Sequence, residues 1–112
     1  MDPFQYYRHL RHTKKYVDEH FTEPIALTDV ARNVGLSPAY YSVFFHKATG
    51  LPFGVWLRKQ RIDRAKKILH VCDRPIYQIA TDVGFGSLSA FERAFKASEL
   101  VAPSVYRKVS RD

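Results

Sequence analysis

With 112 residues, 46% of them hydrophobic and 26% charged, the chain has the composition of an ordinary globular protein, and no apolar run approaches the roughly 20 residues that cross a membrane. The 18 Lys and Arg against 11 Asp and Glu give a net charge of +7, which favours a polyanionic partner, most simply nucleic acid. The length suits one domain and is too short for two, so we expect one compact body with a shared core.

The first predicted element is an amphipathic helix over 4–21, in which basic residues separate apolar positions at three- and four-residue spacing. These apolar positions are Tyr6 or Tyr7, Leu10, Val17 and Phe21. Glu23-Pro24 ends the helix, because the residue before a proline is pushed out of the helical region. A short helix over 27–34 follows, and Gly35 is placed to take the left-handed conformation that closes it.

Ser37-Pro38 is typical of a helix start, because serine accepts a hydrogen bond from a free backbone amide and proline has no amide hydrogen to lose. The helix that it opens runs to Thr49, with Tyr41, Phe44 and Phe45 facing the core. A long helix is predicted over 53–71. Its expected apolar stripe is Trp56 or Leu57, Ile62, Ala65, Ile68 and Leu69, and its remaining positions hold Arg58, Lys59, Arg61, Arg64, Lys66 and Lys67.

The last third of the chain repeats the short-helix, glycine, serine pattern. A helix over 76–83 stops at Gly84, Ser87 caps the next helix over 88–98, and a final helix runs over 103–109. Seven helices and no strand are therefore predicted, an all-α fold.

The segment Val30–Leu36 recurs as Ile79–Phe85, and each copy leads into a second helix with an aromatic pair. A short helix that stops at glycine and is followed at once by another helix is typical of a helix-turn-helix. The glycines Gly35 and Gly84 are 49 residues apart (84 − 35), whereas Phe45 and Phe95 are 50 apart (95 − 45). The second copy should therefore have one extra residue in its turn.

At these residues the chain resembles the DNA-binding domain of the AraC/XylS family of bacterial transcription regulators. In the second copy the resemblance rests on Ile76, Ile79-Ala80, Val83-Gly84-Phe85, Ser87, Phe91, Arg93, Phe95-Lys96, Pro103-Ser104 and Tyr106-Arg107. In the first copy and the long helix it rests on Leu27, Ala31, Val34-Gly35-Leu36-Ser37-Pro38, Phe45, Lys47, Gly50, Arg61-Ile62, Ala65 and Leu69.

The resemblance implies a homeodomain-like architecture of two helix-turn-helix subdomains, about 4–52 and 73–109, joined by a linker helix over about 53–71. Each subdomain would offer its second helix to successive major grooves of double-stranded DNA, roughly 34 Å apart. The implied function is sequence-specific regulation of transcription, more often activation, with RNA polymerase as a further partner. Family members often carry a sensor and dimerisation domain ahead of this one, and some do not; the short start before Phe4 favours a fragment of such a longer regulator.

The sequence departs from the family pattern at three places. The family usually has glycine where Leu100 stands, so we expect the loop there to close differently, with Glu99 as its cap. Val43 stands where many members have arginine, and the basic pair after the aromatic is His46-Lys47. These last two departures weaken the expected base reading of the first copy.

Base contacts are expected from the side of each recognition helix opposite its apolar stripe. These residues are Ala39, Ser42, Val43 and His46 in the first copy and Leu88, Ser89, Glu92 and Arg93 in the second. Arg93 is the best candidate, because its guanidinium can pair bidentately with guanine; a phosphate contact or a surface ion pair with Glu92 is the alternative. Val43 and Ala39 could contact thymine methyl groups, and Glu92 could accept from cytosine or be simply solvated.

Phosphate contacts are expected at the helix starts and from basic side chains that flank them. The candidates are Ser37, Pro38, Tyr40, Lys47, Ser87, Lys96 and Arg107. Tyr40 has an equal alternative in half-buried packing. Phe91 and Phe95 are expected in the core, since a stacking platform for single strands needs exposed rings.

Other functions have little support in the sequence. Cys72 and His70 are close along the chain, but a catalytic pair would also need an orienting third group, and no nucleotide-binding motif occurs, so we expect neither an enzyme nor a cofactor. His9 and His12 are two ligands where structural zinc needs four. The main alternative is a basic helical module that contacts a protein such as RNA polymerase, with little DNA specificity of its own.

The single cysteine cannot form an internal disulfide, and Met1 to Phe4 does not resemble a signal peptide. Both observations favour a cytoplasmic, nucleoid-associated protein.

Overall fold

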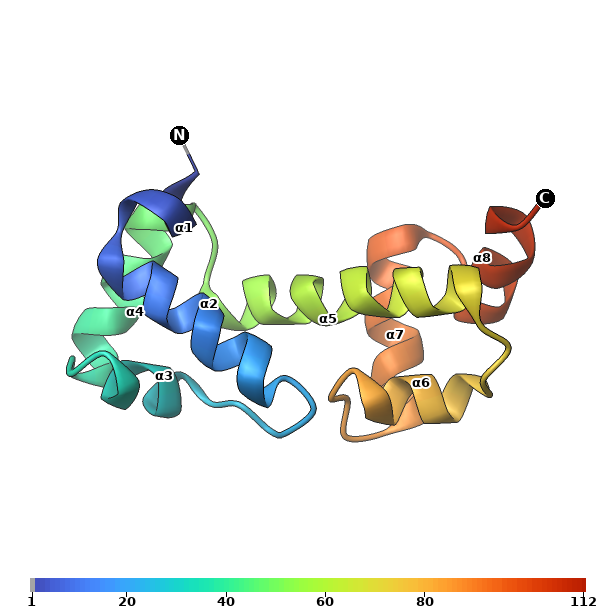
Figure 1. Ribbon diagram of the computed structural model, residues 1–112, viewed down its shortest axis with the longest axis horizontal. Coiled ribbons are helices and arrows are strands. Elements are labelled where there is room, and N and C mark those ends of the chain that lie inside the picture. The colour runs from blue at the N-terminus through green and yellow to red at the C-terminus, as the bar shows by residue number, and fades with distance from the viewer. Residues whose placement is uncertain (1) are drawn as a thin grey trace. The chain divides into compact units, whose positions relative to one another are not determined.

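The computed structural model describes residues 2–112, and all secondary structure within this range is helical (Figure 1). The helices are α1 (Pro3–Tyr6), α2 (Arg8–His20), α3 (Leu27–Asn33), α4 (Pro38–Thr49), α5 (Phe53–Val71), α6 (Ile76–Asp82), α7 (Leu88–Glu99) and α8 (Pro103–Ser110). The all-α prediction is confirmed, and from α3 onward each predicted helix is found within one residue of its expected ends.

The predicted first helix is wrong in one respect, because it is two helices instead of one. Asp2 caps α1 by accepting a hydrogen bond from the amide of Phe4 at 2.9 Å, and Tyr7 is extended (φ −92°, ψ 125°) before α2 begins. The break lets the Phe4 ring stack on Trp56, with ring centroids 5.0 Å apart. A continuous helix would carry Phe4 about 9 Å beyond Leu10 along the axis of α2, at 1.5 Å per residue. The described residues therefore form eight helices, not seven.

The chain folds as two compact units, unit 1 up to Leu57 and unit 2 from Arg58 to Asp112. Each unit has its own cluster of buried hydrophobic side chains, and no residue belongs to both clusters. The expectation of a single shared core is therefore wrong. That expectation assumed that 112 residues are too few for two cores, but many domains of about 55–65 residues bury enough surface to fold alone.

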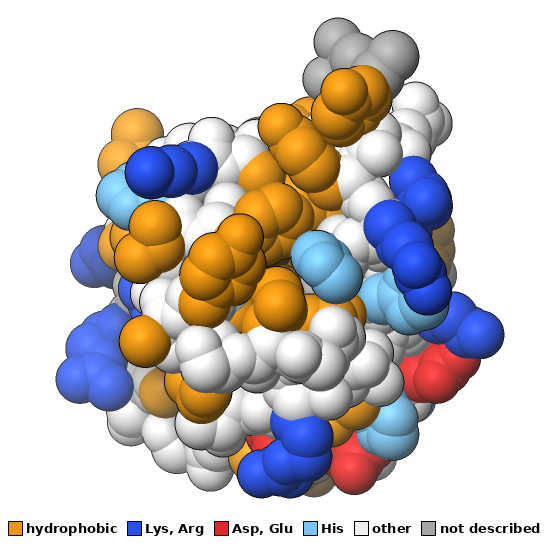
Figure 2. All heavy atoms as spheres, turned by 90° about the vertical axis from the view of Figure 1, so that its left-hand side faces the viewer, with side chains coloured by type: hydrophobic (Ala, Val, Ile, Leu, Met, Phe, Trp, Pro, Cys, Tyr) orange, Lys and Arg blue, Asp and Glu red, His pale blue; other side chains and the backbone are white. Residues whose placement is uncertain are grey.

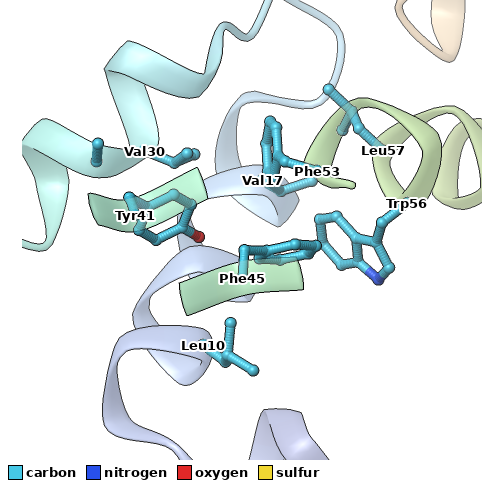
Figure 3. Close-up of a cluster of buried hydrophobic side chains, with 9 residues drawn as sticks. Leu10, Val17, Val30, Tyr41, Phe45, Phe53, Trp56 and Leu57 are labelled. Carbon is cyan, nitrogen blue, oxygen red and sulfur yellow. The ribbon is translucent and has the colours of Figure 1, made fainter. Parts of the chain in front are cut away.

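The core of unit 1 is aromatic and gathers side chains from α2, α3, α4 and α5. Its buried members are Leu10, Val17, Val30, Ala31, Tyr41, Phe45, Phe53, Trp56 and Leu57. Phe45 lies between Tyr41 and Trp56 (Figure 3), with ring centroids 6.0 and 5.5 Å away. Tyr41 and Phe45 are fully buried as predicted, while Phe44 is only half-buried.

The core of unit 2 packs the remainder of α5 against α6 and α7. Its buried members are Ile62, Ala65, Leu69, Ile79, Ala80, Val83, Phe91 and Phe95. Phe91 and Phe95 are 0% exposed, so they are core residues as predicted. Glu99, in the last turn of α7, is held to α5 by an ion pair with Lys66 at 3.0 Å.

Helix α5 contributes to both cores, its first turns to unit 1 and the rest to unit 2. The apolar stripe predicted for it is buried, with Ile68 half-buried. Arg61 lies outside the predicted apolar stripe, yet its side chain is only 6% exposed. It occupies the position directly before Ile62, where a long aliphatic stem can pack and still carry its guanidinium to a polar partner.

The two helix-turn-helix copies close their first helices with the same backbone hydrogen bonds. In unit 1 the amide of Leu36 donates to Ala31 at 2.9 Å, and in unit 2 the amide of Phe85 donates to Ala80 at 2.9 Å. Gly35 (φ +75°) and Gly84 (φ +92°) supply the left-handed residue that this Schellman closure needs. Residues 34–37 connect α3 to α4 and residues 83–87 connect α6 to α7, so the predicted extra residue is confirmed.

Leu100 closes α7 in the left-handed conformation (φ +68°), and its amide donates to the carbonyl of Lys96 at 2.9 Å. Gly50 closes α4 in the same way, with φ +82° and a 2.8 Å bond to His46. The expected difference in closure, with Glu99 as a cap, is therefore wrong. Leucine adopts the conformation of the usual glycine at a cost in backbone strain of roughly 1–2 kcal/mol.

Replacing Leu100 with glycine should stabilise unit 2. The side chain is 82% exposed, so little packing is lost, and the strain released exceeds the roughly 0.4–1 kcal/mol that glycine adds to the entropy of the unfolded chain. We expect Leu100→Gly to raise the free energy of unfolding by about 0.5–1 kcal/mol in urea denaturation followed by circular dichroism. The matched control is Gly50→Leu, which should lower it by a similar amount. A lower midpoint for Leu100→Gly would show that the strain is absent.

Candidate nucleic-acid interface

The second helix of each copy begins with a serine cap. The Oγ of Ser37 accepts from the amide of Tyr40 at 3.2 Å, and the Oγ of Ser87 accepts from the amide of Ala90 at 3.1 Å. Pro38 occupies the first position of α4. Each hydroxyl uses only its oxygen in the cap, so its hydrogen can still be donated to an incoming anion. The first turn of a helix also has unpaired amides and the positive end of the helix dipole.

The residues predicted to read bases are all exposed in both units. In α4 these are Ala39, Ser42, Val43 and His46, and in α7 they are Leu88, Ser89, Glu92 and Arg93. On α4 the opposite side of the helix is held in the core by Tyr41 and Phe45, and on α7 by Phe91 and Phe95. Each helix is thus packed on one face and presents the other to solvent, the arrangement that insertion into a groove requires.

Arg93 forms no ion pair with Glu92 or with any other residue in the described part of the chain. The alternative of a surface ion pair is therefore not what the structure shows. The five donors of its guanidinium are all available for a ligand. Val43 is 55% exposed and Leu88 is 39% exposed, so both copies also present apolar surface on the same face as their polar candidates.

Tyr40 is 62% exposed, which does not fit the alternative of half-buried packing. Lys47 and Lys96 are exposed and, within residues 2–112, form no ion pair. Arg107 differs from the other phosphate candidates because it is half-buried and its Nη2 donates to the carbonyl of Arg74 at 2.6 Å. Its Nε is buried without a hydrogen-bond partner among the described residues. This guanidinium ties α8 to the loop before α6.

The orientation of α4 is fixed from inside unit 1 by a pair of hydroxyls that the sequence did not single out. Thr13 of α2 and Tyr41 are both 0% exposed and share a hydrogen bond, and Thr13 also donates to the carbonyl of His9 at 2.8 Å. Burial raises the pKa of Tyr41 to about 12. Thr13 lies three residues after Leu10 and four before Val17, so the spacing of the apolar stripe could have identified it.

In unit 2 the turn before α7 is held by a buried charge. Arg61 reaches from α5 and donates from Nη1 to the carbonyl of Val83 at 3.1 Å, at the end of α6 where carbonyls lack helical partners. Burial, with a smaller contribution from Arg64, lowers the pKa of Arg61. The two units therefore fix their recognition helices by different chemistry, a neutral hydroxyl pair in one and an arginine in the other.

No helix in the described range is long and apolar enough to cross a membrane. Nor does the range 2–112 contain a group of three or more His, Cys, Asp or Glu side chains that could hold a metal ion. Cys72 is half-buried, and its Sγ accepts from the amide of Arg74 at 3.3 Å.

A family model described as a helix-turn-helix domain matches residues 30–109. The chain is 37% identical over 94 residues to the regulatory protein PocR of Salmonella typhimurium, a match that covers 84% of this chain and 31% of PocR. It is 33% identical over 93 residues to the regulatory protein SoxS of the same organism, covering 83% of this chain and 87% of SoxS. The chain thus spans about a third of one relative and most of the other.

Among solved structures, the C-terminal domain of AraT, a response regulator from Geobacillus stearothermophilus, is 31% identical with a TM-score of 0.87, covering 92% of this chain and 86% of that one. The DNA-binding domain of AdpA, solved in complex with a target DNA, has the same fold at 24% identity, with a TM-score of 0.84 and coverage of 99% and 95%. Together with the duplicated helix-turn-helix and its two exposed helix faces, these similarities show that the chain belongs to the AraC/XylS family of transcription regulators.

Proposed function

We propose that this chain binds a two-part site in double-stranded DNA by inserting α4 and α7 into successive major grooves, and that it regulates transcription from that site. The observation that carries the proposal is the repeated helix-turn-helix whose second helix is buried on one face only. The net charge of +7 supports it, because phosphate neutralisation supplies much of the affinity of DNA-binding proteins. A target DNA bound to AdpA, which shares the fold, supports it further.

The proposed roles follow from the chemistry of each exposed side chain. Arg93 is the principal base reader and pairs with the O6 and N7 of a guanine. Ala39 and Val43 contact thymine methyl groups, so the half-site of α4 should favour A/T base pairs. The proposed base-contact set also includes Ser42, His46, Leu88, Ser89 and Glu92.

Phosphate contacts hold the two helices in register without reading sequence. We propose Ser37, Pro38, Tyr40, Lys47, Ser87 and Lys96 for this role. We also keep Arg107 as a weaker phosphate contact, because its Nη2 already donates a hydrogen bond to the carbonyl of Arg74.

The proposed activity is binding without catalysis, which agrees with relatives that are named as regulatory proteins. We propose RNA polymerase as a second partner, activation as the more common outcome, and the bacterial nucleoid as the place of action. PocR, of which this chain matches 31%, is long enough to hold a separate sensor and dimerisation domain, and we propose such a domain as a further partner.

The test is selection of binding sites from a random duplex pool, followed by affinity measurements over a range of salt concentrations. We expect a site of two parts whose centres are one helical turn apart, with specific binding that survives salt at which binding to random DNA has collapsed. If binding is independent of sequence at every salt concentration, the chain is a basic module that contacts another protein, and the proposal fails.

A further inference from the structure

A shallow apolar groove of about 250 Å³ lies on unit 1, beside the proposed base-reading face. It is lined by Tyr7, Tyr40, Val43, Phe44, Lys47 and Ala48. Figure 2 shows the hydrophobic side chains of this end of the molecule gathered in a band, with Lys and Arg side chains at its edges. All lining residues but one come from α4; Tyr7 comes from the break between α1 and α2 and faces α4 through a ring contact with Phe44 at 5.6 Å.

The groove occupies a third face of α4, next to the face proposed to read bases. Successive residues of a helix are about 100° apart around its axis, so Tyr40 and Lys47 lie roughly a quarter turn from the face centred on Ala39 and His46. Val43 lies between the two faces and belongs to both. When a recognition helix enters a major groove, the sugar–phosphate strands run along the flanks of that helix. The groove is therefore continuous with the proposed interface at the place where a strand would pass.

The chemistry of the groove suits such a strand. Lys47 supplies one positive charge at its edge, and the hydroxyls of Tyr7 and Tyr40 form no hydrogen bond within the described residues. The floor of Val43, Phe44 and Ala48 can contact the apolar edge of a deoxyribose or a thymine methyl group. Six lining residues are far fewer than the roughly 20–30 that each side of a stable protein interface contributes, which disfavours a second protein as the occupant.

We propose that this groove holds one sugar–phosphate strand of the DNA at the edge of the half-site of α4, and that Tyr7 donates a hydrogen bond to a phosphate there. The inference rests on the proposed function and extends the interface to the α1–α2 junction. The Tyr7 side chain is 39% exposed, and removing its hydroxyl would leave the ring on Phe44 intact.

The experiment compares Tyr7→Phe with wild type and with Tyr6→Phe as the matched control. Tyr6 is the neighbouring tyrosine, is 63% exposed and does not line the groove. Dissociation constants are measured by fluorescence anisotropy on the selected site and on a random duplex, and phosphates are mapped by ethylation interference. We expect Tyr7→Phe to weaken binding about 2- to 10-fold on both duplexes, the effect of one lost hydrogen bond, and Tyr6→Phe to bind as wild type does.

Ethylation of one phosphate beside the half-site of α4 should interfere with wild type and no longer with Tyr7→Phe. Unchanged thermal unfolding of Tyr7→Phe assigns the loss to the contact and not to the fold. If both variants bind as wild type and give its interference pattern, the inference is overturned while the proposed function stands. If Tyr7→Phe binds DNA normally but reduces transcription, the groove takes a protein and the inference is also overturned. A wild type without a preferred site would instead refute the proposed function.

Discussion

Arg93→Ala should lose roughly 1–3 kcal/mol of specific binding, a weakening of about 5- to 150-fold, and should relax the preference at one base pair. The loss is expected because Arg93 is exposed on α7 and unpaired within residues 2–112, so its guanidinium can make two hydrogen bonds to one guanine. The measurement is the affinity of wild type and variant for the selected site and for the three possible substitutions at each of its base pairs.

Arg93→Lys separates the geometry of this contact from its charge. Lysine keeps the charge but lacks the planar fork, so affinity for random DNA should be kept while affinity for the selected site falls. Lys47→Ala is the matched control for a phosphate contact: it should weaken all sequences alike and reduce the slope of log affinity against log salt by about 1. Equal losses on specific and random DNA for Arg93→Ala would refute its role as a reader.

Phe95→Ala should unfold unit 2 and leave unit 1 folded. Phe95 is 0% exposed, and replacing a buried phenylalanine by alanine costs about 3–5 kcal/mol. A unit of about 55 residues has only roughly 3–8 kcal/mol of stability in total, so this loss removes most of it. Because no buried residue is shared between the two cores, the loss should not reach the core around Phe45.

Amide hydrogen exchange measured residue by residue checks this expectation. In Phe95→Ala, protection should collapse in α6 and α7 and persist in α2 and α4. Phe45→Ala is the symmetric control, because Phe45 is the equivalent fully buried residue of unit 1 and should give the opposite pattern. If both units lost protection together in either variant, α5 would be coupling them into one cooperative body.

Most helix ends could be predicted because local signals set them. Ser37-Pro38 and Ser87 begin α4 and α7, and Gly35 and Gly84 close the helices before them, each through bonds within a few residues. Leu100 shows the limit of such signals. The family usually has glycine at this position, and only the φ of +68° in the structure reveals that leucine adopts the left-handed conformation there.

Features that depend on distant parts of the chain could not be predicted in this way. Tyr7 breaks the first helix because Phe4 has a stacking partner in Trp56, which lies 52 residues later (56 − 4). Arg61 is buried because its guanidinium donates a hydrogen bond to the carbonyl of Val83, at the end of α6. The exposed faces of α4 and α7 were predicted correctly, since an apolar stripe on one side of a helix implies a free surface on the other. The groove beside Tyr7 was missed, because it needs the break that the sequence did not reveal.

The buried hydroxyl pair of Thr13 and Tyr41 makes the stability of unit 1 depend on pH in the alkaline range. An unfolded tyrosine ionises near pH 10, whereas burial raises the pKa of Tyr41 to about 12, so its contribution to folding is complete below pH 10 and is lost as the pH rises from about 10 to 12. The buried aromatic rings of unit 2, Phe91 and Phe95, have no ionisable group. A pH between about 10 and 12 therefore weakens unit 1 through a buried side chain of its recognition helix, whereas in unit 2 it acts on the Lys66–Glu99 ion pair, in which Glu99 raises the pKa of Lys66.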